Sequence, residues 1–119
     1  MSQDQQTPVI LEQHGAIAVI TMSNPPLNTL SHSVRLGLDR VLTKVITDSE
    51  IKGAVLCGEG RAFCAGADVR EFDQAPQTPS LPDVIRLIEA CPKPVVALIH
   101  GVAFGGGLEL ALGCHYRLA

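Results

Sequence analysis

Three consecutive glycines stand directly before a short helical pattern in residues 101–113, GVAFGGGLELALG. Glycine lets the backbone approach a ligand closely, and the first N–H groups of a helix have no partner within it. The helix dipole adds partial positive charge at the same point. The pattern also carries one carboxylate, Glu109, soon after the glycines. This combination predicts a site in which backbone N–H groups hold an oxyanion beside an acid or base.

Two simpler explanations of this segment stay open at this stage. Glycine runs also form tight turns or close packing contacts, and a lone glutamate on a helix usually faces water. The neighbours of Glu109 are apolar, however: Phe104, Leu108, Leu110, Ala111 and Leu112. We therefore expect Glu109 to be buried, where an ionised carboxylate is costly unless it is paired. Buried acids are candidate functional groups, although structural ion pairs give the same pattern.

A second loop of small residues occupies residues 58–68, GEGRAFCAGAD. It follows the apolar run 53–57, which predicts a short buried strand. Two loops that each supply one backbone N–H donor are the minimum for an oxyanion hole. Cys64 lies in this loop, and a nucleophilic role for it is the less favoured alternative because no histidine stands nearby in a suggestive position.

The rest of the chain alternates between strand and helix patterns. We expect strands at 9–13 and 16–21 joined by a tight turn at His14-Gly15, and further strands at 94–99 and from Tyr116 onward. Helices are expected from the N-cap Ser31 to about residue 47, at 81–90 and at 108–112. Residues 70–80, rich in Pro, Gln and Thr, predict a mobile loop. This order indicates an α/β fold with a mainly parallel sheet.

Composition limits the classes of function. The net charge is −3 and no basic patch is present, which argues against nucleic acid as a partner. No apolar run approaches the ~18 residues of a membrane span, and the first residues lack a signal-peptide layout, so we expect a cytoplasmic protein. The four cysteines show neither metal-ligand nor disulfide spacing, so no metal is expected, and Cys57 and Cys114 are interpreted as buried thiols.

Four segments in order resemble the crotonase superfamily, the enoyl-CoA hydratase/isomerase group. They are NPPLNTL at 24–30, GRAFCAGADVR at 60–70, KPVVA at 93–97 and the glycine segment 101–113. The ending GCHYR at 113–117 is similar to the hydratase part of multifunctional β-oxidation enzymes, in which a hydroxyacyl-CoA dehydrogenase follows. The resemblance implies a crotonase-like repeated ββα spiral. Residues 1–119 would form only its N-terminal half, ending before the second catalytic glutamate of the family.

The resemblance also implies roles for individual residues. The backbone N–H groups of Ala67 and Gly106 would hold the thioester carbonyl, and Glu109 would be the first of two catalytic glutamates. For Arg70, a solvent-facing charge and a phosphate contact are equally open. The residues implied in substrate and CoA binding are Ala65, Ala67, Asp68, Val69, Arg70, Gly105 and Gly106. Leu27 and Asn28 lie in the segment that flanks the CoA pocket, with no specific contact assigned to either. For Asn24 and Asn28, turn chemistry is favoured over ligand contact.

The implied reaction is the addition of water to trans-2-enoyl-CoA in fatty-acid β-oxidation, with an acyl-CoA as substrate. No cofactor is expected, and NAD would enter only with a dehydrogenase domain. A homotrimer or hexamer is the expected assembly. The alternatives are a catalytically incomplete piece that serves acyl-CoA binding or assembly, and another crotonase activity such as isomerisation. Glu109 and the ending at 113–117 favour hydration.

Overall fold

A five-stranded sheet forms the centre of the molecule in the computed structural model, which describes residues 8–119. Its strand order is β1-β2-β3-β5-β7, made of β1 (Val9–His14), β2 (Ile17–Met22), β3 (Gly53–Gly58), β5 (Val95–Leu98) and β7 (Tyr116–Leu118). β1 and β2 form an antiparallel hairpin, and every other pairing in this sheet is parallel. The expected mainly parallel α/β arrangement is therefore confirmed.

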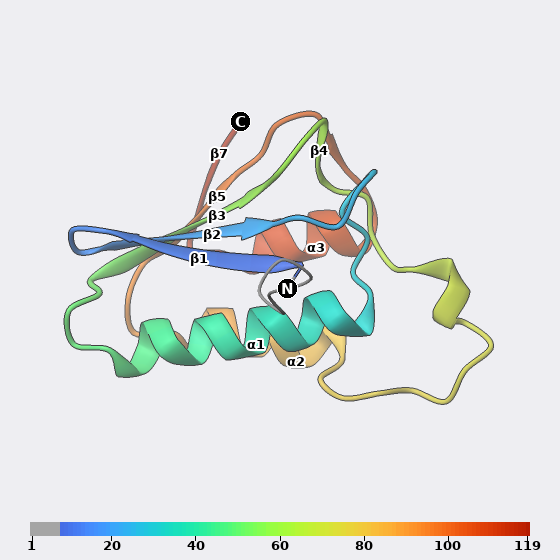
Figure 1. Cartoon of the computed structure of the whole chain (residues 1–119), viewed down its shortest axis with the longest axis horizontal. Helices are drawn as coiled ribbons and strands as arrows, with labels where there is room; N and C mark the ends of the chain where they lie inside the picture. Colours follow the sequence, from blue (N-terminus) through green and yellow to red (C-terminus); the bar gives the residue numbers. More distant parts are fainter. Residues whose placement is uncertain (1–7) are drawn as a thin grey trace, which may run out of the picture.

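Three α-helices and a small second sheet surround this centre. The helices are α1 (His32–Thr47), α2 (Leu81–Ala90) and α3 (Gly106–Gly113), and a short 3-10 helix, η2, spans Val69–Glu71. Figure 1 shows α1 and α2 side by side along one face of the sheet, with η2 projecting beyond one end. The small sheet pairs β4 (Ala62–Cys64) with β6 (Val102–Ala103) in parallel. α3 packs against β4, β6 and α2.

The core lies between the helices and the sheet. The spacing of apolar residues along each strand and helix explains which residues belong to it. In β2, Ala18, Ile20 and Met22 are fully buried, as expected for alternate residues on one face of a strand. α1 buries one stripe at helical spacing: Val34, Leu38, Val41, Leu42 and Val45. The Ser31 side chain accepts a hydrogen bond from the Val34 N–H at 3.3 Å and so caps this helix as predicted.

Several element boundaries differ from the expectations. The hairpin turn lies at Gly15 and Ala16, because His14 still pairs with Ile17. The short strands β4 and β6 were not predicted. α3 begins at Gly106 rather than at residue 108, so two of the three glycines belong to its first turn. Among residues 8–119, no helix has the length and apolar character to cross a membrane.

The segment expected as a mobile loop at 70–80 contains η2 and is attached to α1. The Arg35 guanidinium donates through Nε to the Pro79 carbonyl at 2.7 Å and pairs with the Glu71 carboxylate at 3.1 Å. The other Glu71 oxygen accepts from the His32 backbone N–H at 2.8 Å. Both ends of the segment are therefore held by the first turn of α1.

Candidate active site

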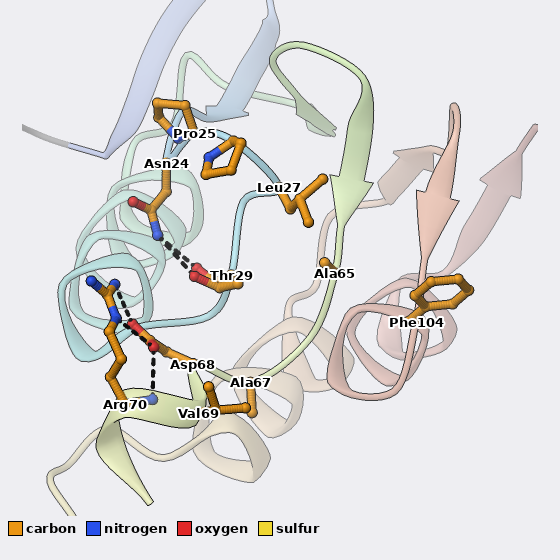
Figure 2. A pocket seen from close by; sticks show the side chains of 11 residues that line it. Asn24, Pro25, Leu27, Thr29, Ala65, Ala67, Asp68, Val69, Arg70 and Phe104 are labelled. Atoms are coloured by element: carbon orange, nitrogen blue, oxygen red, sulfur yellow. Dashed lines mark hydrogen bonds and ion pairs between the residues drawn. The ribbon is translucent and has the colours of Figure 1, made fainter.

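A pocket of about 540 Å³ lies between the turn at 24–29 and the chain that leaves β4. Figure 2 shows the side chains that line it, which come from the turn at 24–29, from the 65–70 segment and from Phe104. Five of the predicted substrate residues line it, namely Ala65, Ala67, Asp68, Val69 and Arg70. Leu27, expected beside the pocket, also lines it, whereas Gly105, Gly106 and Glu109 do not. Thr29, Phe104 and both prolines of the NPP motif also line the pocket but were not predicted as site residues. For the prolines, their position in an extended turn was the only indication.

The direction of the Ala67 N–H is set by the peptide group that contains it. The Gly66 carbonyl of that peptide accepts a hydrogen bond from the Leu30 N–H at 2.7 Å. In a trans peptide the C=O and N–H point to opposite sides, so the Ala67 N–H points away from Leu30. Among residues 8–119, it donates to no backbone carbonyl. Gly66 adopts a φ of +106°, a conformation that glycine accepts readily, and this bend turns the peptide into place.

The Gly106 N–H is arranged in the same way at the start of α3. The Gly105 carbonyl accepts from the Glu109 N–H at 3.0 Å, so the N–H on the other side of this peptide points out of the helix N-terminus. Within the described part of the chain, it too has no backbone acceptor. A β-carbon built on Gly106 would lie 3.6 Å from the Ala67 nitrogen. The two predicted donors, from distant segments, are therefore neighbours in space.

Gly107 brings the two segments together by close packing. A β-carbon at this position would overlap the Cys64 carbonyl oxygen and lie 2.7 Å from its carbonyl carbon. The same carbonyl oxygen accepts a hydrogen bond from the Phe104 N–H at 3.2 Å. The glycine run therefore has two effects: Gly106 presents an N–H, and Gly107 allows α3 to touch the end of β4.

Cys64 is excluded as a nucleophile by its surroundings. Its side chain is fully buried, and burial raises the pKa of the thiol to about 11, so it is protonated at neutral pH. Cys114 is buried as expected, and burial raises its pKa to about 12. Cys57 is only half-buried, contrary to the expectation. In the part of the chain that the structure describes, no group of three or more His, Cys, Asp and Glu side chains is arranged to hold a metal ion.

Asp68 and Arg70 form a bidentate pair at the pocket (Figure 2). Arg70 Nε lies 3.0 Å from Asp68 Oδ1, and Nη2 lies 2.8 Å from Oδ2. These hydrogen bonds lower the pKa of Asp68, and its carboxylate also caps η2 by accepting from the Arg70 N–H. The Asp68 side chain is 7% exposed and that of Arg70 is 80% exposed. The Asp68 carboxylate therefore holds one edge of the Arg70 guanidinium, and the rest of that group is exposed.

Glu109 is exposed, so the expectation that it is buried is wrong. On α3 only Leu110 and Ala111, with two glycines, are buried. Leu108 and Leu112 are 44% and 58% exposed, and the preceding Phe104 is 65% exposed. The helix is apolar on both faces, but only one face contacts the core. The candidate role of Glu109 now rests on its place in the first turn of α3, three residues after Gly106, and on the family motif.

Comparisons with known proteins identify the family of this chain. The family model described as enoyl-CoA hydratase/isomerase matches residues 12–119. The human peroxisomal bifunctional enzyme is 49% identical over 108 residues, which are 89% of this chain and 15% of that protein. A probable enoyl-CoA hydratase of Bacillus subtilis is 42% identical over 110 residues, which are 87% of this chain and 43% of that protein.

A solved structure shows the same arrangement of elements. The enoyl-CoA hydratase of Thermoplasma volcanium superposes with a TM-score of 0.86 at 28% identity, over 98% of this chain and 49% of that one. The chain thus spans about half the length of these two hydratases and 15% of the human bifunctional enzyme. It has the crotonase-like α/β fold, and it belongs to the enoyl-CoA hydratase/isomerase family.

Proposed function

We propose that this chain supplies the substrate-polarising part of an enoyl-CoA hydratase that acts on trans-2-enoyl-CoA in fatty-acid β-oxidation. One observation carries the proposal: the N–H groups of Ala67 and Gly106 lie close together beside a pocket, and neither has a backbone partner among residues 8–119. Adding water to an enoyl thioester places negative charge on the carbonyl oxygen. Two preorganised N–H donors stabilise that charge where it develops, and losing one such donor typically costs ~10²–10³ in rate.

Glu109 is the proposed acid/base residue of this site. A carboxylate can orient the attacking water, take one of its protons and return a proton to the substrate. In the family this work is shared by two glutamates, and we propose no residue of this chain for the second. The acid/base part is thus incomplete within these residues. Hydration itself uses no cofactor, and NAD belongs to the proposal only where a dehydrogenase domain follows.

The walls of the pocket are the proposed binding site of the CoA moiety. Ala65 and Val69 offer small or apolar contacts. Gly105, which does not line the pocket, is proposed to let the backbone come close to the thioester. Arg70 is held by Asp68 on one edge only, and its exposed guanidinium is placed to attract an anionic phosphate of CoA.

A trimer or hexamer is the proposed assembly. The proposed location is cytoplasmic. Two relatives with similar sequences are named as peroxisomal, so membership of the family does not determine the compartment.

Acyl-CoA binding without turnover, and isomerisation, are the competing functions. A direct test is Glu109→Gln in the whole polypeptide that contains these residues, because glutamine keeps the shape and removes the proton-transfer group. Hydration of crotonyl-CoA, followed by loss of the enoyl absorbance, should fall by at least ~10²-fold while acyl-CoA binding changes little. Glu89→Gln on α2, an exposed glutamate outside the site, is the matched control. Near-normal turnover by Glu109→Gln would remove the catalytic assignment.

The 119-residue chain alone gives a second test. It contains both proposed donors and one proposed carboxylate, so we expect weak acyl-CoA binding and no measurable hydration. Hydration by this chain, as a monomer verified by light scattering, at a rate close to that of the whole polypeptide would show that Glu109 acts without a second carboxylate.

A further inference from the structure

Asn28 is a buried polar residue that the pocket does not explain. It is 1% exposed, and it is not among the residues that line the pocket. Its side-chain Nδ2 lies 3.0 Å from the Glu59 carbonyl oxygen, 2.9 Å from that of Ala62 and 3.4 Å from that of Phe63. Its Oδ1 accepts from the Asn24 N–H at 2.8 Å. Both ends of the amide are therefore bonded, as burial requires.

Turn chemistry accounts for only part of this arrangement. The bond from the Asn24 N–H and the φ of +55° are local features that asparagine often provides in a turn. The bonds from Nδ2 instead reach residues 31 to 35 positions later in the chain. They fasten the turn to the loop that enters β4 and to β4 itself. The prediction of a local role for Asn28 therefore covers only part of what the residue does, because no local pattern indicates this long-range contact.

The fastened turn lies against the segment that carries a proposed oxyanion donor. On one side of Asn28, the Leu27 carbonyl accepts from the Ala65 N–H at 3.0 Å. On the other side, the Leu30 N–H donates to the Gly66 carbonyl at 2.7 Å, within a parallel bridge between Leu30 and Ala67. The second bond sets the direction of the Ala67 N–H, because both groups belong to one peptide plane.

We infer that Asn28 is a positioning residue for the oxyanion hole: its buried amide holds residues 27–30 so that the Leu30 N–H aims the Ala67 N–H at the thioester carbonyl. The inference rests on the proposed role of Ala67. It differs from a purely structural role in one measurable respect. Loss of the Asn28 amide should weaken the binding of the carbonyl group specifically, rather than the binding of CoA in general.

The test is Asn28→Gly in the whole polypeptide that contains these residues. Glycine adopts the same positive φ without strain, so the backbone of the turn can keep its conformation while the amide is lost. The polar space left behind can admit a water molecule. The probes are butyryl-CoA, a saturated thioester that cannot be hydrated, and S-butyl-CoA, the thioether in which a CH₂ replaces the carbonyl. Dissociation constants are measured by NMR titration, which tolerates weak binding.

The wild-type chain should bind the thioester about 10-fold more tightly than the thioether, as two modest hydrogen bonds provide. In Asn28→Gly this preference should fall to about 3-fold or less, with thioether binding changed little. The isotope-edited infrared band of the bound thioester carbonyl should also move back towards its value in free butyryl-CoA. Val45→Ala, a cavity variant in the last turns of α1, controls for general destabilisation and should keep the wild-type preference.

Hydrogen exchange gives a readout that needs no ligand. The Leu30 amide should exchange faster in Asn28→Gly than in Val45→Ala at matched stability. Asn28→Asp, which keeps the shape but loses both N–H donors, should act in the same direction and serves if the glycine variant does not fold. An unchanged thioester preference together with unchanged Leu30 protection would overturn the positioning role alone. A wild-type chain with no preference for the thioester would overturn the proposed oxyanion hole, and the role of Asn28 with it.

Discussion

Replacing Gly107 by alanine should destabilise the chain, although alanine is the better helix former. In a helix interior this change alone stabilises by up to ~1 kcal/mol. At Gly107, however, the added methyl group would overlap the Cys64 carbonyl oxygen and lie 2.7 Å from the carbonyl carbon. That carbonyl cannot easily rotate away, because it accepts the Phe104 N–H. We therefore expect α3 to move away from β4.

The magnitude follows from setting these two effects against each other. Overpacking a well-packed site usually costs ~1–3 kcal/mol, and we expect Gly107→Ala to cost ~2–3 kcal/mol, the upper part of this range, because the obstacle is backbone. After the gain in helix propensity is subtracted, the free energy of unfolding should fall by about 1–3 kcal/mol. At about 4 °C per kcal/mol for a chain of this size, the thermal midpoint should fall by roughly 4–12 °C.

The assay is thermal unfolding followed by circular dichroism at fixed protein concentration, with Gly113→Ala as the matched control. Gly113 lies in the same helix, but there the new methyl would meet only a side-chain methyl group of Ile85, at 2.9 Å, which can move. Gly113→Ala should therefore cost clearly less. A thermal midpoint of Gly107→Ala at or above that of the wild type would refute the view that this backbone contact sets the position of α3.

Three further perturbations test the site and its surroundings. In the whole polypeptide, Gly106→Pro removes the proposed N–H donor and Gly106→Val crowds it, so both should abolish hydration of enoyl-CoA of every chain length. Normal turnover of short substrates by Gly106→Val would contradict the assignment of the Gly106 N–H to the oxyanion hole. The lowered pKa of Asp68 means that its pairing with Arg70 stabilises the fold above the ordinary carboxyl range and is lost as the pH falls through the Asp68 pKa. The difference in thermal midpoint between wild type and Arg70→Gln should therefore shrink on acidification, and a constant difference would count against the pair. Finally, exposed apolar side chains on α3 predict self-association of the 119-residue chain, so Leu112→Lys should raise the monomer fraction in light scattering, whereas Leu36→Lys on α1 should not.

Local patterns predicted the larger elements correctly. The helix from His32 to Thr47 carries both a cap, Ser31, and an apolar stripe, and these signals need no knowledge of the rest of the fold. The strands β4 and β6 are only three and two residues long. Such short strands exist because each has the other as a partner, and single-chain periodicity cannot reveal a pairing between distant segments.

The candidate site was predictable in its parts but not in its orientation. Two glycine-containing segments were expected to present N–H donors, and Ala67 and Gly106 do lie close together. The direction of the Ala67 N–H depends on Leu30 and on the long-range bonds of Asn28, for which the sequence carries no local signal. The burial of Glu109 was predicted wrongly because apolar neighbours on a helix indicate an interior position only where both faces are covered.

The two proposed N–H donors are oriented in the same way, and this affects how mutants are interpreted. In each, the carbonyl of the donor's own peptide is fixed by a backbone N–H from elsewhere: that of Leu30 for Ala67, and that of Glu109 for Gly106. Glu109 therefore contributes twice, through its backbone to the geometry of a donor and through its side chain to the proposed chemistry. Glu109→Gln keeps the first contribution, since its N–H is unchanged. Any loss of rate in Glu109→Gln consequently reports on the carboxylate, whereas a loss of thioester preference in Asn28→Gly reports on the direction of the Ala67 donor.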